Sequence, residues 1–304
     1  MNIKEFTELI KVKPYIMGMG KGLLSKRYNI SPEDVLKAKS IYTSTRQSER
    51  MPKILLFDIE TSPMKAYIWN LWKTNVHPEQ LTSDWFCIAW SAKWLYSGDI
   101  MGEVLTPQEI KQENDYRIML ELWKLINEAD IVITHNGNKF DIPRINARFI
   151  IHGFSPTTPY YSIDTCQIAR KQFGFTSNKL DCIAGYFNIA HKLETSFNLW
   201  KECLEGDEEA LSYMLEYNKM DVKILEEVYL KLRPWIKGHP NIANYIDSDC
   251  CCNCGSVDIR EIPNDYYYTQ VNKYKLYRCR ECGAISRGRK PVNKSKISMV
   301  NNTR

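Results

Sequence analysis

The sequence lacks the features of membrane and secreted proteins. In its 304 residues, no uninterrupted apolar run approaches the roughly 18 residues that a membrane span requires. The opening segment, MNIKEFTELIKVKP, has neither the apolar centre nor the small-residue cleavage site of a secretion signal. We therefore expect a soluble, cytoplasmic protein that does not bind a membrane.

Cysteines are scarce before residue 250. Four of the ten lie there, at Cys87, Cys166, Cys182 and Cys203, and they are scattered. Because Cys87 and Cys166 occur in apolar or strand-like sequence, we expect buried, reduced thiols and no disulfide framework. The other six are crowded together after residue 249.

The net charge of +5 is unevenly distributed. Residues 1–50 carry 10 Lys/Arg against 5 Asp/Glu, and residues 251–304 carry 11 against 4, so the centre of the chain is acidic. Basic ends around an acidic centre suit a metal-binding domain held on a polyanion, although solvated surface charge gives the same pattern.

Two pairs of residues are spaced so that their side chains share one face of an element. Asp58 and Glu60 end an apolar, β-branched run and are two residues apart, which predicts one face of a strand. Tyr217 and Asp221 are four residues apart in a helical pattern, which predicts one face of a helix. Asp141 follows a short apolar run, and we expect all these groups to point to one place.

Four carboxylates pointed at one place repel each other unless cations lie between them. Their hard oxygen ligands suit Mg²⁺ or Mn²⁺. Two such ions about 3.5–4 Å apart clamp the attacking and leaving oxygens of a phosphodiester. The carboxylates of Asp58, Glu60, Asp141 and Asp221 therefore predict a site with two Mg²⁺ or Mn²⁺ ions.

This ordered set resembles the motifs of the DEDDy exonucleases, proofreading-type 3′→5′ nucleases on a ribonuclease H-like fold. FDIET resembles their first motif, residues 136–141 their second, and Tyr217 with Asp221 their third. The resemblance covers roughly residues 51–235. The strings TSPMKAYIW, IAWSAKW and LRPWIKGHPN are similar to exonucleases of bacteriophages and some bacteria, and in a viral protein the cytoplasm would be that of the host.

The resemblance implies a role for each site residue. Asp58 would bridge both ions, Glu60 and Asp221 would complete the first, and Asp141 would hold the second. Tyr217 would orient the attacking water, since a tyrosine pKa near 10 disfavours base catalysis at neutral pH. Substrate contacts are expected from Thr61, Asn136 and Phe140.

The expected activity is metal-dependent 3′→5′ exonuclease action on DNA, from single-stranded ends. An exoribonuclease with the same site stays open, because discrimination of the 2′-hydroxyl is not visible in sequence. A non-catalytic nucleic-acid-binding protein also stays open. EDTA would stop a nuclease, whereas binding through the basic ends would survive chelation.

The expected fold is a ribonuclease H-like mixed sheet of five strands flanked by helices. Three strands, at residues 53–59, 66–72 and 86–94, predict an antiparallel meander, and short strands at 131–134 and 160–163 complete the sheet. The pattern predicts helices at residues 115–129, 142–152, 164–173, 179–187 and 208–232.

Residues 1–45 show a helical pattern. Ser31 is a good N-cap with Pro32 at the first helical position, and the segment resembles a helix-turn-helix whose recognition helix would be residues 31–39. A capped helical hairpin with a basic surface is the alternative. Polar residues 46–52 predict a linker, and residues 51–238 form the expected exonuclease domain.

Two C-x-x-C-G segments indicate a zinc ribbon over residues 248–286. Zn²⁺ requires four ligands in a tetrahedron, and two C-x-x-C turns supply two each. A redox pair is a weaker alternative, because one C-x-x-C would suffice for it. Cys250 and Cys252 are surplus, and residues 287–304 read as a basic disordered tail. The predicted zinc ligands are Cys251, Cys254, Cys279 and Cys282.

Overall fold

The computed structural model describes residues 1–12, 20–189, 194–246 and 248–292. Most of the predicted tail, residues 293–304, lies outside the described residues. The chain divides into two compact units: residues 1–51 with 241–250, and residues 52–240 with 251–304. Among the described helices, none is both long enough and apolar enough to span a bilayer.

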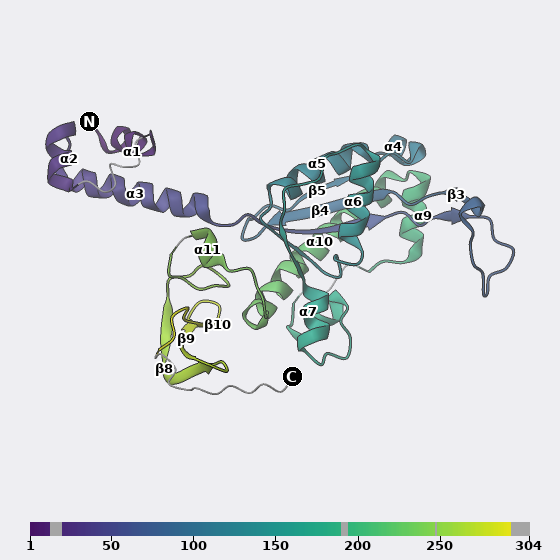
Figure 1. Cartoon of the computed structure of the whole chain (residues 1–304). Coiled ribbons are helices and arrows are strands. Elements are labelled where there is room, and N and C mark those ends of the chain that lie inside the picture. Colours follow the sequence, from purple (N-terminus) through teal and green to yellow (C-terminus); the bar gives the residue numbers. More distant parts are fainter. Residues whose placement is uncertain (13–19, 190–193, 247, 293–304) are drawn as a thin grey trace. The chain divides into compact units, whose positions relative to one another are not determined.

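A mixed sheet of five strands forms the centre of the larger unit (Figure 1). Its order is β5-β4-β1-β6-β7, with β1 antiparallel to β4 and parallel to β6. This confirms the predicted five-stranded mixed sheet. The strands are β1 (Ile54–Thr61), β4 (Cys87–Trp94), β5 (Met101–Val104), β6 (Ile131–Thr134) and β7 (Tyr161–Asp164).

The predicted strand at residues 66–72 is wrong. Only β2 (Lys65–Ala66) is extended there, and it pairs with β3 (Leu81–Ser83) outside the central sheet. The third strand of the meander is β5, which the sequence did not indicate because Gly102 interrupts it. A Cβ at Gly102 would lie 2.9 Å from a Leu215 side-chain carbon, so this glycine allows the helix that carries Leu215 to approach the sheet.

Helices cover both faces of the sheet. On one face, Leu55 and Phe57 of β1 pack in the same core as Ile118 and Met119 of α5. On the other, α10 packs against β1, β4 and β5 (Figure 1). The predicted helices are confirmed within two residues at each end, whereas α4 and α9 were not predicted. The helices are α4 (Pro107–Gln112), α5 (Tyr116–Glu128), α6 (Asp141–Ile151), α7 (Thr165–Gln172), α8 (Leu180–Tyr186), α9 (Phe197–Glu205) and α10 (Glu208–Leu232), with 3-10 turns η2 (Pro78–Gln80) and η3 (Arg233–Trp235).

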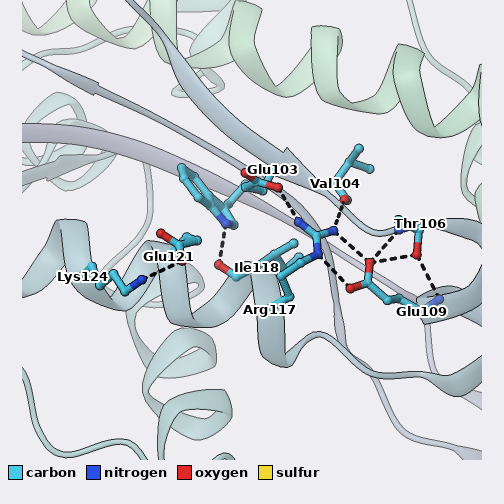
Figure 2. A network of polar contacts seen from close by, with 9 residues as sticks. Glu103, Val104, Thr106, Glu109, Arg117, Ile118, Glu121 and Lys124 are labelled. Carbon is cyan, nitrogen blue, oxygen red and sulfur yellow. Dashed lines mark hydrogen bonds and ion pairs between the residues drawn. The ribbon is translucent and has the colours of Figure 1, made fainter.

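An arginine-centred network joins β5, α4 and α5 (Figure 2). Arg117 donates from Nε and Nη2 to the carboxylate of Glu109, each at 2.8 Å, and it also pairs with Glu103. Glu109 closes the capping box of α4 with Thr106. The Arg117 guanidinium lowers the pKa of Glu109 to about 2. This network holds the start of α5 against the end of β5.

A buried ion-pair cluster fixes α6 to the sheet. The Asp115 carboxylate, fully buried, accepts hydrogen bonds from the Cys87 N–H at 2.8 Å and from Arg148 Nε at 2.8 Å. His152 Nε2 lies 2.6 Å from the same carboxylate. Because Asp115, Cys87 and the α6 residues come from three different elements, this contact positions the helix that begins at Asp141.

The smaller unit is helical. It contains α1 (Ile3–Val12), α2 (Lys21–Tyr28), α3 (Pro32–Arg50) and α11 (Ile242–Ile246). The turn before α3 has Asn29 at φ +49°, and Ser31 Oγ accepts from the Asp34 N–H at 3.0 Å, as the predicted N-cap requires. The predicted linker at residues 46–52 is helical as far as Arg50, where α3 ends, and the boundary between the two units falls after Met51. The core of the smaller unit contains Phe6, Ile10, Leu24, Ile30, Val35 and Ala38.

The early cysteines lie where the sequence analysis expected them. Cys87, Cys166 and Cys203 are buried free thiols, and Cys182 is half-buried. Burial raises the pKa of Cys203 to about 12. The three buried thiols, whose pKa values are raised by burial, are therefore packing groups and not nucleophiles.

Candidate active site and four-cysteine group

Three of the four predicted metal-binding carboxylates lie together. Asp58 and Glu60 leave the same face of β1, and Asp221 reaches them from α10. One carboxylate oxygen from each lies within 4.8 Å of the other two. Asp221 is buried, whereas Asp58 and Glu60 are half-buried. We call these three residues the carboxylate cluster.

Irregular pairing marks the end of β1. The register against β4 shifts between Glu60 and Thr61, so that Glu60 lies opposite Ala89 and Thr61 opposite Cys87. Such bulges re-aim the side chains that follow them and are common beside active sites. The sequence gives no sign of this irregularity.

Asp141 lies beside the same strand but outside the cluster of three. It is the first residue of α6, and its Oδ1 accepts from the Ile59 N–H at 3.2 Å. Burial raises the pKa of Asp141 to about 7; the charge of Asp164 adds to this rise, and the Ile59 N–H opposes it. A carboxyl group held this way gains from a nearby cation, which would keep it ionised.

Tyr217 lies one helical turn before Asp221 on α10. It is half-buried, packs against the main core, and meets the ring of Trp200 edge-on at 6.5 Å between centroids. Trp200 belongs to α9, a helix that the sequence did not predict. The ring of Tyr217 is thus held between α10 and α9.

Asn218 is a site residue that the sequence analysis missed. Its side chain is fully buried, and its Nδ2 donates to Asp58 Oδ2 at 2.7 Å. The position is three residues before Asp221, so the helical period already placed it on the inward face. An asparagine three residues before Asp221 in a helical pattern was the available signal.

A cavity of about 500 Å³ opens next to the carboxylate cluster and shares Glu60 with it. Thr61 and Phe140, two of the predicted substrate-binding residues, line this cavity. Asn136, the third, is not among the lining residues. The lining residues are Glu60, Thr61, Ser62, Pro63, Met64, Trp85, Phe140, Arg144, Thr195, Ser196, Phe197 and Trp200.

Asn136 is part of a turn anchored by Asp164. It adopts φ +69°, and its N–H donates to Asp164 Oδ1 at 2.9 Å. The same carboxylate caps α7 by accepting from the N–H groups of Cys166 and Gln167. A Cβ at Gly137 would lie 2.4 Å from the Cβ of Thr134, so the turn requires a glycine there. Asp164 therefore acts as a helix cap and as the anchor of the loop before Asp141.

Arg144 supplies the cavity with a positive charge, which the sequence analysis did not identify. Its guanidinium carbon lies 3.7 Å from the ring centroid of Phe140 and 5.2 Å from that of Trp85. Its Nε is buried and has no hydrogen-bond partner within the described part of the chain. The cavity thus combines one cation, several aromatic walls and, at Glu60, the edge of the carboxylate cluster.

The cysteines predicted as zinc ligands also lie together. The Sγ atoms of Cys251, Cys254, Cys279 and Cys282 are all within 4.8 Å of one another, with Cys251–Cys282 and Cys254–Cys279 at 3.6 Å. Four sulfurs about 2.3 Å from one zinc ion lie about 3.8 Å apart, so the spacing fits Zn²⁺. The Cys254 thiol and the Asn253 N–H lower the pKa of the Cys251 thiol, and the same contact with Cys251 raises the pKa of the Cys254 thiol.

A small sheet and two tight turns hold these cysteines. The strands β8 (Ile259–Tyr268), β9 (Lys273–Cys279) and β10 (Ile285–Arg287) are in the order β10-β9-β8. Gly255 and Gly283 both adopt φ +78°, as the C-x-x-C-G turns require. Cys250 and Cys252 lie outside the group of four. The group is compatible with a zinc ribbon.

The tyrosines of this small sheet carry cations on their faces. Lys273 Nζ lies 4.6 Å from the ring centroid of Tyr266, and the Arg287 guanidinium lies 4.5 Å from that of Tyr274 and 5.5 Å from that of Tyr267. Part of the surface of these tyrosine rings is therefore committed to neighbouring cations.

Comparison with known proteins supports the fold. Residues 95–233 match the model of the RNase_H superfamily, a range that contains Asp141, Tyr217 and Asp221 but begins after β1. Together with the mixed sheet, this match shows that the chain contains an RNase H-like domain. No curated protein matched the chain.

One similar solved structure is the family B DNA polymerase from the hyperthermophilic archaeon Pyrobaculum calidifontis. The sequence identity is 16%, the TM-score is 0.47, and the match covers 75% of this chain and 33% of the polymerase. The chain therefore spans about a third of the length of that protein.

Proposed function

We propose that this protein is a metal-dependent nuclease that hydrolyses the phosphodiester bonds of DNA from a single-stranded 3′ end. The observation that carries the proposal is the carboxylate cluster, in which three carboxylates converge on an RNase H-like sheet. The preference for DNA and the 3′→5′ polarity come from the resemblance of the motifs to the DEDDy exonucleases.

The donor set fits Mg²⁺ or Mn²⁺. Asp58, Glu60 and Asp221 offer only carboxylate oxygens, which are the ligands that these hard cations prefer. We assign Asp141, which lies beside the same strand, to a second ion. When bound, such ions activate a water molecule and neutralise the charge that develops on the leaving oxygen.

The remaining residues of the site position the reactants. Asn218 holds the Asp58 carboxylate through a hydrogen bond of 2.7 Å. We assign Tyr217 to orienting the attacking water. We assign Phe140 to contact with the terminal base, and Arg144, stacked on its ring, to contact with a phosphate. Thr61 lies at the rim of the same cavity.

We assign the four-cysteine group to one structural Zn²⁺. The small sheet has few buried apolar side chains around the cysteines, so the metal would supply much of its folding free energy. The basic residues of this segment suit a second contact with the nucleic acid.

A 5′-labelled single-stranded DNA with Mn²⁺ tests the proposal. Wild type should give a descending ladder of labelled products, and Asp221→Ala should give none, because the cluster loses one of its three carboxylates. Tyr217→Phe should reduce the rate without abolishing it, since the ring would still pack. If wild type leaves the DNA at full length but cleaves RNA, the substrate is RNA. If wild type cleaves neither, the protein binds nucleic acid without hydrolysing it.

A further inference from the structure

An exposed hairpin follows β1, and we call residues 64–83 the aromatic hairpin. β2 pairs with β3 at its base, and backbone and side-chain hydrogen bonds between Tyr67 and Gln80, at 2.9 and 2.8 Å, extend the closure. Beyond this base the chain has no strand, and Figure 1 shows it projecting past β3. The hairpin is thus a closed stem with an irregular tip.

The tip carries large aromatic side chains in water. Trp69 is 93% exposed and Trp72 is 85% exposed, and Tyr67 and Leu71 are also exposed. Single exposed apolar residues are ordinary on protein surfaces, but several adjacent ones indicate a binding site. Since tryptophan is among the least favourable residues to leave in water, the tip is suited to a partner that covers flat rings.

Both legs of the aromatic hairpin end at the cavity beside the carboxylate cluster. Met64, the residue before β2, lines the cavity, and so does Trp85, two residues after β3. A strand whose end enters the cavity would therefore leave it next to the hairpin. This continuity points to the same ligand at both places.

The charge of the hairpin favours a polyanion. The aromatic hairpin carries Lys65 and Lys73, both exposed, against one acidic residue, Glu79 in the turn next to β3, and no Asp or Glu occurs from residue 61 to 78. Rings interleaved with cations match the alternation of bases and phosphates in an unpaired strand. A docking surface for an apolar protein face would gain nothing from these lysines.

We propose that the aromatic hairpin binds the unpaired nucleotides upstream of the cavity, by stacking bases on Tyr67, Trp69 and Trp72. The proposal rests on the proposed function, because it takes the nucleic acid in the cavity as the same strand. It makes single-stranded nucleic acid the ligand class of the site and gives the protein a longer footprint than the cavity alone.

Binding of a labelled oligo-dT in EDTA tests the stacking directly, because it requires no cleavage. Stacking on an aromatic side chain contributes about 1–3 kcal/mol per base. Trp69→Leu and Trp72→Leu should therefore each raise the Kd for oligo-dT at least about fivefold. Trp69→Phe should retain most of the affinity, because it keeps a flat ring. Leu71→Ala, in the same tip, should bind as wild type. Duplex DNA of the same length should bind the wild type and the leucine variants equally.

The outcomes separate this inference from the proposed function. If the leucine variants weaken binding and wild type cuts no substrate, the hairpin assignment stands and the nuclease assignment fails. If wild type degrades DNA and all variants bind oligo-dT equally, the hairpin assignment alone is overturned. It is also overturned if Leu71→Ala weakens binding as much as Trp69→Leu, or if the tryptophan variants abolish only a protein–protein association in sedimentation.

Discussion

Replacing Asn218 tests whether the Asp58 carboxylate must be held in place. In Asn218→Ala, the half-buried Asp58 loses a hydrogen bond of 2.7 Å from a fully buried side chain. Hydrogen bonds to charged groups contribute about 1.5–3 kcal/mol, so kcat/KM should fall about 10- to 150-fold if the whole loss appears in the transition state. The Mn²⁺ concentration for half-maximal activity should rise as well, because a carboxylate that is free to change its orientation binds a cation less tightly.

Stability should change less than activity. The Asn218 Oδ1 atom is buried without a hydrogen-bond partner among the described residues, so the wild type already carries the cost of one unsatisfied acceptor. The alanine variant removes that cost while it leaves a small cavity, and these effects oppose each other. We expect the free energy of unfolding to change by less than about 2 kcal/mol.

The assay is steady-state cleavage of 5′-labelled single-stranded DNA over a Mn²⁺ titration, with urea unfolding of each variant. Asn218→Leu, which keeps the branched arrangement of heavy atoms but has no donor, should lose activity as the alanine variant does. Ser212→Ala, at an exposed position of the same helix, is the matched control and should behave as wild type. Unchanged kcat/KM and Mn²⁺ dependence in Asn218→Ala would refute the assigned role, as would a loss explained entirely by unfolding.

Three further predictions follow from other parts of the chain. Gly137→Ala would place a Cβ 2.4 Å from the Cβ of Thr134, so unfolding in urea should show a loss of about 1–3 kcal/mol; an unchanged midpoint would contradict the required close approach. Because Arg117 lowers the pKa of Glu109 to about 2 from an ordinary value of 4.5, the stabilisation is fully present above pH 4.5 and is lost as the pH falls through 2. The stability difference between wild type and Glu109→Gln should therefore shrink between pH 4.5 and 2, and a difference independent of pH would disprove the pairing. Cys279→Ser should lose the single bound zinc and unfold at a lower temperature, as metal analysis and calorimetry would show, whereas one zinc retained per chain would exclude the cysteine group as its site.

The parts of the site that regular periodicity controls could be predicted from the sequence. Spacings of two and four residues placed Asp58, Glu60 and Asp221 on inward faces, and the structure brings these carboxylates together. Glycine turns after Cys254 and Cys282 were likewise readable, because only a positive φ closes such a turn.

Other features depend on contacts between distant segments, which no local pattern encodes. The strand β5 contains Gly102, a poor strand residue that is required because α10 packs there. The run Tyr67-Ile68-Trp69 has strong β propensity, yet its side chains are exposed, because the adjoining strands β2 and β3 form a sheet of only two strands. Arg144 became a site residue only when α6 placed it over Phe140 and Trp85.

Mn²⁺ located by anomalous scattering in crystals of the protein tests the central claim most directly. We predict two peaks, one among Asp58, Glu60 and Asp221 and a second beside Asp141, and the loss of the first peak in Asp221→Ala. Crystals that bind Mn²⁺ elsewhere, with no peak at these carboxylates, would contradict the assignment of this site to metal-dependent phosphodiester hydrolysis.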